Sequence, residues 1–437
     1  MLNRLISEVR SDAPAIKRNV FETVQSFWRW TCAIRGDLLL VAVIAVFLGG
    51  ATFILAHQMP EHATHPTFDT GAWFESDLAR VKKTMTARGP HNYRTYVHPL
   101  QTLLMYVPTK AMIIAGLSEI TAVMLYLATI AGLWGGLLYA TLRGLGLRRP
   151  DAIVFTALGA STSASVFWFP VPESYGVGAL SLMITFALGV AIFRYKLPAF
   201  IHAVASASSL SIATTNWMAG ILLAFSANSY KRAIRITLDA LLIVTVLFAV
   251  QKVIDPNSQF FVPGSHEWSF VLHESAGGPL NKVIVFFLYG VAMPAIPNLE
   301  NAASPDWAGL TIQTVMPSQL APAAIAGLLA WMTLLVIGVK FACRTGVSRG
   351  LFHVLSLYIA FELFLHLVYG DETFLFSLNY VPAMVLVAGC SALSSRRVTV
   401  LALALICTGL LAYNNLTMYV SATAELATHI ANLSDKP

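Results

Sequence analysis

The stretch DTGAWFESDLARVKKTMTARGPHNYRTYVHP, residues 69–99, is rich in charged residues although the chain as a whole is apolar; we call it the charged island. Only 11% of the 437 residues are charged, yet this stretch holds three acids, five bases and two histidines. In its centre Leu78, Val81 and Met85 recur at helical spacing and can share one face, while Asp77 lies on another. An amphipathic helix of this kind lies in a membrane interface and does not cross the bilayer.

The rest of the chain has the composition of a membrane protein. Hydrophobic residues make up 57% of it and the mean hydropathy is +0.68, which excludes a soluble globular protein. Apolar runs of about 20 residues, the length needed to cross the hydrocarbon core, recur throughout. We therefore predict an all-α polytopic membrane protein with about eleven transmembrane helices, the first being a retained anchor. The predicted spans are residues 37–56, 119–142, 151–169, 176–193, 198–215, 217–230, 237–254, 321–340, 351–369, 375–393 and 398–419.

The basic residues predict the orientation, because Lys and Arg stay preferentially in the cytoplasm. With the N-terminus inside, 19 of the 28 Lys and Arg residues lie in the N-terminal tail or at the inner ends of spans. The apolar stretches 99–116 and 280–297 are interrupted by prolines, and making either one a span would invert this pattern. We read both as interfacial or re-entrant helices on the outer side, so that two interfacial helices lie in the first outer loop.

This reading divides the chain into four parts. They are a cytoplasmic N-terminal segment (1–36), a transmembrane module (37–254) with its first outer loop (57–118), an outer loop with an interfacial helix (255–320), and C-terminal transmembrane helices with a short outer tail (321–437). The chain has no clustered basic face with interleaved aromatic residues, so nucleic acid is not an expected partner.

The charged island suits one kind of reaction. Attack by a hydroxyl on an activated sugar needs a base to take the proton and cations to stabilise a departing phosphate. Asp77 and Arg80, three residues apart, can lie on one flank of a helix and serve the same site. Glu75 and Asp69 are alternatives for the base. The competing interpretation is a solvated loop whose charges simply avoid lipid.

Three segments of this region resemble the first outer loop of the GT-C glycosyltransferases, integral membrane enzymes that use polyprenyl-phosphate-linked sugars. They are FESDLARV (74–81), NYRTYVHPLQTLL (92–104) and the Ser118–Glu119 turn into the next span. In that family a retained first span is followed by an acidic motif on a juxtamembrane helix and then by a second juxtamembrane segment. The acids here are separated, as Glu-Ser-Asp, so the choice between Glu75 and Asp77 stays open.

The resemblance implies a fold, a reaction and a location. It implies a GT-C-like fold in which Asp77 or Glu75 is the acidic residue of the catalytic loop, with Asp69 kept as the further alternative from the residues themselves. In the reaction predicted on this basis, Arg80, Arg94 and His98 hold the donor phosphate. The implied partners are a polyprenyl-phosphate sugar donor, a glycan, lipid or protein acceptor, and membrane lipids. The implied location is the inner (plasma) membrane of a bacterium, with the N-terminus in the cytoplasm and the active site facing outward.

Other outer turns carry further candidates for substrate binding. Glu173, in the sequence PVPESY, lies between the third and fourth predicted spans, where the alternative role is to cap a helix. Glu362 and His366 are four residues apart within a predicted span and share one face, and Glu372 lies in the next outer turn. A carboxylate inside a span is costly in lipid, so this column favours a polar cavity, with a buried helix-packing pair as the alternative.

The histidines of the first outer loop raise the question of a metal. His57, His62 and His65 have the spacing H-x4-H-x2-H and His91 follows, but this pattern matches no metal site that we can derive, and HExxH is absent. We predict no metal ligands and no cofactor, and keep a divalent metal as the alternative.

Two other functions compete with glycosyl transfer. A membrane transporter or lipid flippase would use Glu362 and His366 as a relay, although the chain lacks the internal repeat typical of transporters. An O-antigen ligase or polymerase-like enzyme would use a late outer loop, and 255–320 is the segment that fits this alternative.

Overall fold

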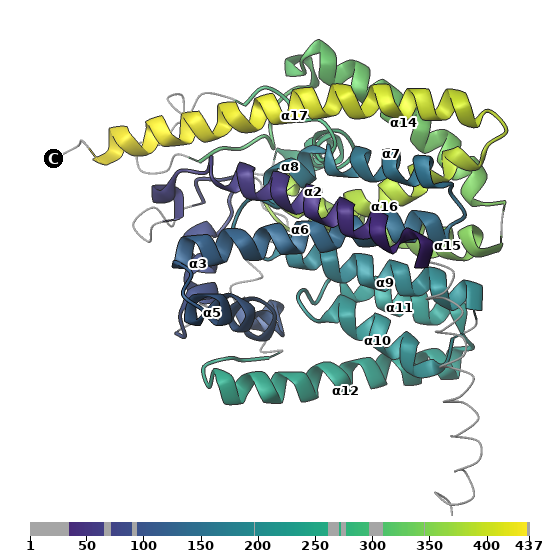
Figure 1. The fold of residues 1–437 in the computed structure, drawn as a ribbon, viewed down its shortest axis with the longest axis horizontal. Coiled ribbons are helices and arrows are strands. Elements are labelled where there is room, and N and C mark those ends of the chain that lie inside the picture. Colours follow the sequence, from purple (N-terminus) through teal and green to yellow (C-terminus); the bar gives the residue numbers. More distant parts are fainter. Residues whose placement is uncertain are drawn as a thin grey trace, which may run out of the picture.

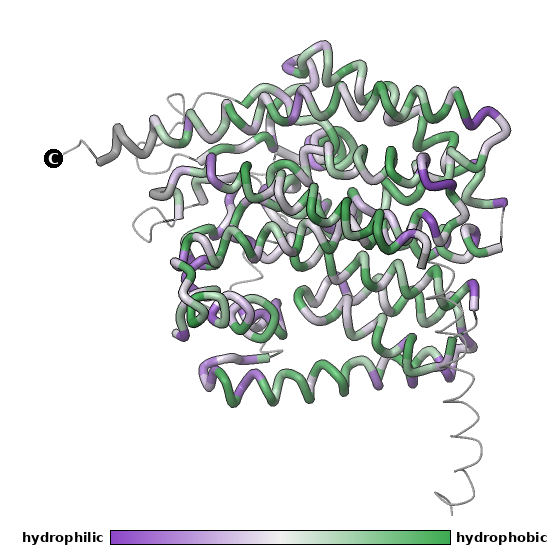
Figure 2. Tube along the Cα trace, viewed as in Figure 1, coloured by the Kyte–Doolittle hydropathy of each residue, from purple (hydrophilic) through white to green (hydrophobic). Residues whose placement is uncertain are grey.

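The computed structural model describes residues 35–64, 71–89, 94–195, 197–260, 271, 277–296, 309–344 and 346–434. In this part of the chain eight helical segments are long and apolar enough to cross a membrane, and Figure 1 shows the long helices running side by side. Figure 2 shows hydrophobic residues along their lengths and hydrophilic residues gathered at their ends. The predicted all-α polytopic architecture is confirmed. The eight are α2 (Leu38–Ala56), α6 (Glu119–Gly144), α9 (Tyr175–Tyr195), α12 (Tyr230–Ile254), α14 (Pro322–Ala342), α15 (Gly346–Val368), α16 (Ser377–Gly389, extended by short 3-10 turns) and α17 (Arg397–Ser434).

The other three predicted spans are shorter helices. They are α10 (Ala199–Leu210), α11 (Trp217–Ala227), and a pair, α7 (Arg149–Ala160) and α8 (Ser163–Trp168), where a single span was predicted. The pair is broken at Thr162, whose side chain accepts a hydrogen bond from the Ser165 N–H and so caps α8. Each of the eleven predicted spans thus corresponds to a helix or a broken helix.

Residues 278–294 pack against the break between α7 and α8. The short helix α13 (Gly278–Ile284) continues into the π-helical turn η7 (Val285–Tyr289), and the chain after it is non-helical and buried. The Ser163 N–H donates to the Val291 carbonyl over 3.1 Å, and the Asn415 side-chain amide donates to that carbonyl over 2.9 Å. These contacts satisfy backbone groups that would otherwise be unpaired in an apolar interior.

Close packing of α2 on α6 fixes the start of the first loop. A side chain at Gly132 would place its Cβ 2.4 Å from the Ala45 carbonyl oxygen, so only glycine permits this approach. Small residues at helix crossings let backbones approach in this way in membranes. The packing sets the point from which residues 57–118 leave the bundle.

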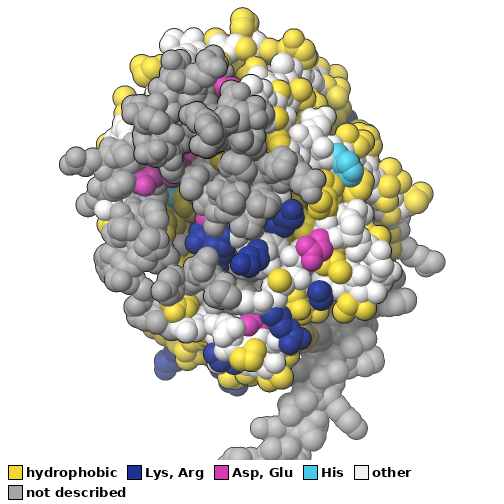
Figure 3. Space-filling model, turned by 90° about the vertical axis from the view of Figure 1, so that its left-hand side faces the viewer, with side chains coloured by type: hydrophobic (Ala, Val, Ile, Leu, Met, Phe, Trp, Pro, Cys, Tyr) yellow, Lys and Arg dark blue, Asp and Glu magenta, His cyan; other side chains and the backbone are white. Residues whose placement is uncertain are grey.

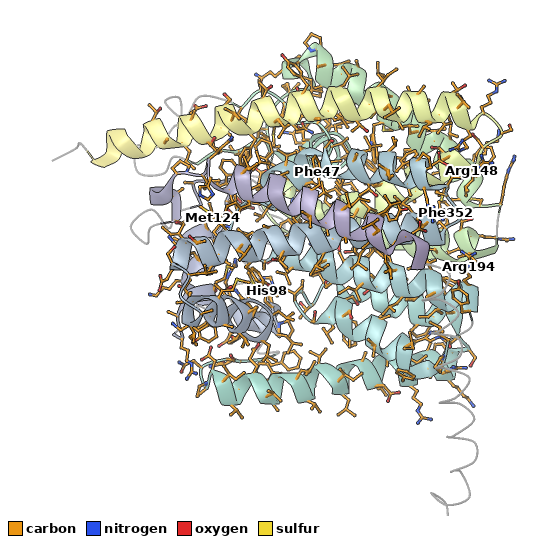
Figure 4. All side chains as sticks on the ribbon, in the orientation of Figure 1. Phe47, His98, Met124, Arg148, Arg194 and Phe352 are labelled. Carbon is orange, nitrogen blue, oxygen red and sulfur yellow. The ribbon has the colours of Figure 1, made fainter. Side chains whose placement is uncertain are left out.

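The two ends of the bundle differ in chemistry. At one end Asp37 pairs with Arg143 over 2.9 Å and with Arg149 over 2.6 Å. Figure 4 places Arg148 and Arg194 at this arginine end, and His98 and Met124 toward the opposite end. That opposite end, which we call the α3 end, carries the two predicted interfacial helices of the first loop, and their presence is confirmed. They are α3 (Leu78–Thr86) and η4–α5 (Thr102–Tyr106 and Val107–Ile114), with a single helical turn, α4 (Arg94–Val97), between them.

Candidate active site

The loop that precedes α3 has a strained backbone. Phe74 and Glu75 are consecutive non-glycine residues with positive φ angles of 48° and 59°. Each such residue costs of order 1–3 kcal/mol, and strain of this kind persists only where the surroundings enforce it, often at functional sites. Here the Glu75 N–H donates to the Gly71 carbonyl over 3.0 Å, and the Ser76 hydroxyl donates to the Trp73 carbonyl over 2.6 Å.

Aromatic packing anchors this loop in the bundle. Trp73 and Phe74 are completely buried. The Trp73 ring stacks on Phe167 of α8 with centroids 5.6 Å apart, and the Phe74 ring meets Phe374 edge-on at 5.2 Å. Because aromatic side chains bury large apolar areas, these contacts hold the strained turn against the broken helix.

A second loop supports the strained turn from the other side. The Leu310 N–H donates to the Ala72 carbonyl over 2.9 Å. The buried carboxylate of Glu372 accepts from the Thr311 hydroxyl over 2.6 Å and from the Ile312 N–H over 3.3 Å. Burial raises the pKa of Glu372 to about 7, against the opposing effect of these donors. Glu372 therefore supports the loop next to the site, and its predicted contact with substrate stays a prediction.

Four charged side chains from three segments meet at the start of α3. The Asp77 carboxylate forms an ion pair with Arg80 and accepts from Arg94 Nη1 over 3.0 Å. Arg94 Nη2 lies 2.6 Å from Glu173 Oε1, and the same oxygen accepts from the Asp77 N–H over 3.0 Å. The structure thus brings together Asp77, Arg80, Arg94 and Glu173, all of which the sequence had singled out.

The surroundings favour the charged forms of Asp77 and Arg94. Burial alone would raise the pKa of Asp77, but Arg94 and Arg80 outweigh it and keep this pKa below its usual value. Burial likewise opposes the charge of Arg94, whereas Glu173 and Asp77 raise the pKa of this guanidinium above its usual value. The side chain of Asp77 is 29% exposed and that of Glu173 only 1%. Asp77 is therefore the carboxylate of this cluster that a substrate can reach.

Glu173 fills a positioning role in this arrangement. Its second oxygen, Oε2, accepts from the Ser174 N–H over 2.7 Å and from the Ser174 hydroxyl at 3.3 Å. With both oxygens engaged, Glu173 orients Arg94 and the first turn of α3. Its predicted role in substrate binding remains a prediction. Ser174 is a contributor that the sequence analysis missed, and its only signal was its place directly after Glu173.

His98 joins the cluster in a neutral form. Its Nδ1 lies 2.6 Å from the Ile212 carbonyl, so this nitrogen carries the proton and donates it. The other nitrogen, Nε2, lies 3.5 Å from the Ser174 hydroxyl. Burial, together with nearby Arg94, lowers the pKa of His98 from 6.5 to about 3. In neutral His98 the free nitrogen, Nε2, can only accept a hydrogen bond. The predicted role of His98 in holding a phosphate therefore requires a phosphate that carries a proton and can donate it to Nε2.

The lowered pKa of His98 predicts a loss of stability in mild acid. Below pH 6.5 the unfolded chain takes up a proton that the folded protein does not accept until about pH 3, so folding becomes less favourable as the pH falls. At pH 5 this amounts to about 2 kcal/mol relative to pH 7.5. Thermal unfolding in detergent at both values should show a smaller acid-induced decrease for His98→Gln than for the unaltered protein. An equal decrease in both would contradict the assignment.

The remaining site candidates are Glu75, Asp69 and His366. Glu75 is half-buried in the strained turn, and Asp69 and His91 lie outside the described residues. His366 is buried on α15, 3.2 Å from Glu362, and stacks on Phe376 with centroids 4.4 Å apart. Phe376 in turn packs against Tyr175, which follows Ser174 in sequence, so rings separate His366 from the charged cluster.

The α3 end of the molecule carries basic side chains at its surface. Figure 3 views this end, where Lys and Arg side chains lie near the middle of the face. Within the described part of the chain, no group of three His, Cys, Asp or Glu side chains could hold a metal ion. The site seen here is built from guanidinium and carboxylate groups.

Comparison with solved structures identifies the fold. The chain resembles the crystal structure of ArnT from Cupriavidus metallidurans bound to undecaprenyl phosphate, with a TM-score of 0.52 and 14% sequence identity, over 90% of this chain and 77% of that one. The fold is GT-C-like. The architecture implied by residues 74–81 and 92–104 is thereby confirmed for the fold. No protein-family model and no curated protein sequence matches the chain. This chain and the ArnT structure therefore share a fold although few of their aligned residues are identical.

Proposed function

We propose that this protein is a membrane glycosyltransferase that moves a sugar from a polyprenyl-phosphate-linked donor to an acceptor hydroxyl. The observation that carries the proposal is Asp77. Its partly exposed, ionised carboxylate pairs with two arginines, Arg80 and Arg94, at the α3 end of a GT-C-like fold. The similar structure holds undecaprenyl phosphate, a lipid phosphate of the class that such a donor would release. The acceptor is a glycan, a lipid or a protein.

The chemistry assigns separate roles to the cluster. The acceptor oxygen attacks the anomeric carbon, its proton passes to Asp77, and the bond between that carbon and the phosphate oxygen breaks. Polyprenyl phosphate leaves with the electron pair, and Arg80 and Arg94 balance its charge. A carboxylate paired with two guanidinium groups is a weak base. Transfer of Arg80 from Asp77 to the donor phosphate would free a carboxylate oxygen for the proton. A single displacement of this kind inverts the anomeric centre.

The location follows from the basic residues. Arg143, Arg149 and Arg397 lie at the arginine end in ion pairs with acidic side chains, and the bias of Lys and Arg assigns this end to the cytoplasm. The α3 end and Asp77 then face outward, in the inner membrane of a bacterium. Nucleotide sugars are confined to the cytoplasm, so a lipid-linked donor fits this side of the membrane. The four-part division at 36/37, 254/255 and 320/321 is part of the same proposal.

A transporter or lipid flippase is the second candidate. The observation that favours it is His366, buried beside Glu362 within α15, whose Nδ1 has no hydrogen-bond partner among the described residues. Ionisable side chains inside a membrane often line ion or substrate paths. Much of the loop that an O-antigen ligase or polymerase-like enzyme would use, residues 261–270 and 297–308, lies outside the described residues.

Two assays on the purified protein separate these functions. Reconstituted in liposomes with a panel of polyprenyl-phosphate sugars and membrane extract as acceptor source, a glycosyltransferase releases polyprenyl phosphate and labels an acceptor. A flippase moves labelled lipid across the same vesicles without releasing it. We expect release together with acceptor labelling. Lipid movement in the absence of release would overturn the proposal.

A further inference from the structure

A cavity of about 510 Å³ lies at the α3 end, apart from the charged cluster. Its walls come from the end of α2, the first turns of α6, the helix α3, the turn at Pro170 and Pro172, and the last part of α17. Its volume is in the range that binds small ligands, about 300–1,000 Å³. Figure 4 places Met124, one of its lining residues, on α6 toward this end.

The cavity is amphipathic. Val123, Met124 and Leu127 of α6 give it an apolar wall, while His57, Thr64 and Lys82 supply polar groups. Lys82 Nζ donates to the Thr64 hydroxyl over 2.9 Å, and an ammonium group has two further hydrogens to donate. No acidic side chain lines the cavity among the described residues. The positive charge of Lys82 is therefore available to an anionic group of a ligand.

The cavity and the charged cluster are built on neighbouring residues of the same segments. Pro172 lines the cavity, and the next residue, Glu173, accepts hydrogen bonds from Arg94 and from the Asp77 N–H. Helix α3 contributes to both, since Asp77 is its N-cap residue and Lys82, within the helix, lines the cavity. Five positions separate these two residues, which places them on different faces of the helix at 3.6 residues per turn. A ligand in the cavity therefore lies beside the cluster but not on its arginines.

We propose that this cavity binds the acceptor, an amphipathic lipid whose hydrocarbon chain lies against α6 and whose phosphate lies at Lys82. The inference rests on the proposed glycosyl transfer and chooses the lipid among the three acceptor classes. Two arguments carry it. Arg80 and Arg94 pair with Asp77 in the cluster, which leaves Lys82 as a separate cation for a second anionic lipid. The cavity also adjoins exposed apolar surface, since Ile54, two residues before the lining residue Ala56 on α2, is 64% exposed.

Photo-crosslinking tests the occupant without requiring turnover. The protein is reconstituted in phosphatidylcholine vesicles that contain either phosphatidic acid with a diazirine-bearing acyl chain or a diazirine-bearing polyprenyl phosphate. We expect phosphatidic acid to label the peptide that contains Val123, Met124 and Leu127. Lys82→Ala should reduce this labelling about 10-fold, and the exposed neighbour variant Lys83→Ala should leave it unchanged. Preferential labelling of that peptide by polyprenyl phosphate, or equal labelling in both variants, would overturn the proposal.

Filling the cavity provides an independent test. Met124→Trp should reduce labelling by phosphatidic acid about 10-fold and leave labelling of other peptides by polyprenyl phosphate unchanged. Leu125→Trp, one residue further along α6 and 39% exposed, is the matched control. Gel filtration and thermal unfolding establish that each variant is folded. If phosphatidic acid labels the cavity but no donor is consumed by the unaltered protein, the glycosyltransferase proposal fails and lipid binding stands. Undiminished labelling in folded Met124→Trp rejects the cavity itself.

Discussion

Asp77→Asn is expected to abolish glycosyl transfer and to leave the protein folded. Asparagine has nearly the same shape and keeps an oxygen for Arg80 and Arg94, but it cannot take a proton at neutral pH. General-base catalysis contributes about 10²- to 10⁴-fold, so transfer should fall by at least 100-fold. The measurement is release of polyprenyl phosphate from a lipid-linked sugar by purified protein, with the unaltered protein assayed in parallel.

The matched control for this experiment is Glu75→Gln. Glu75 lies two residues before Asp77 in the strained turn, so both variants remove one carboxylate from the same loop. We expect Glu75→Gln to retain most of the activity, because the Asp77 carboxylate is the one placed between two arginines. Activity lost in Glu75→Gln and retained in Asp77→Asn would transfer the role of base to Glu75. Full activity in both would reject the proposed reaction.

The fold was predictable where hydropathy alone determines it. An apolar run such as 237–254 must form a helix, because in lipid every backbone polar group needs an internal partner. Hydropathy did not show the break between α7 and α8, because residues 151–169 still read as one apolar run despite the polar Ser161, Thr162 and Ser163 in its middle. What stabilises the break is the carbonyl of Val291, more than a hundred residues away, held in turn by Asn415. Contacts across such distances leave no periodic signal in the sequence.

The sequence indicated which residues form the charged cluster, but not most of the contacts between them. Asp77 and Arg80 are three residues apart on one helix, so spacing was enough to pair them. The contact of Arg94 with Glu173 spans 79 residues and depends on how α4 meets the turn before α9. For that reason the sequence did not show that the Glu173 carboxylate accepts from Arg94, Asp77 and Ser174, and its predicted contact with substrate stays a prediction.

The strongest expected effect on stability belongs to the pair of Arg94 and Glu173. Arg94→Ala would leave the Glu173 carboxylate, only 1% exposed, without its cation. Removal of one partner from a buried ion pair typically costs about 3–5 kcal/mol, because the remaining charge is desolvated and unpaired. We expect purified Arg94→Ala to show a large decrease in its apparent melting temperature in detergent. Arg88→Ala, an exposed arginine on the segment after α3, is the control and should change little.

The double variant Arg94→Ala/Glu173→Gln then tests the cause of that loss. Glutamine removes the unpaired charge and keeps one oxygen, which can accept from either the Asp77 N–H or the Ser174 N–H but not from both, so the double variant should be more stable than Arg94→Ala alone. Recovery of stability would not restore transfer, because the guanidinium beside Asp77 is still missing. This separation of stability from activity is what a positioning role for Glu173 requires. If the destabilisations of the two single variants simply add in the double variant, the two side chains are not coupled and Glu173 must serve another purpose.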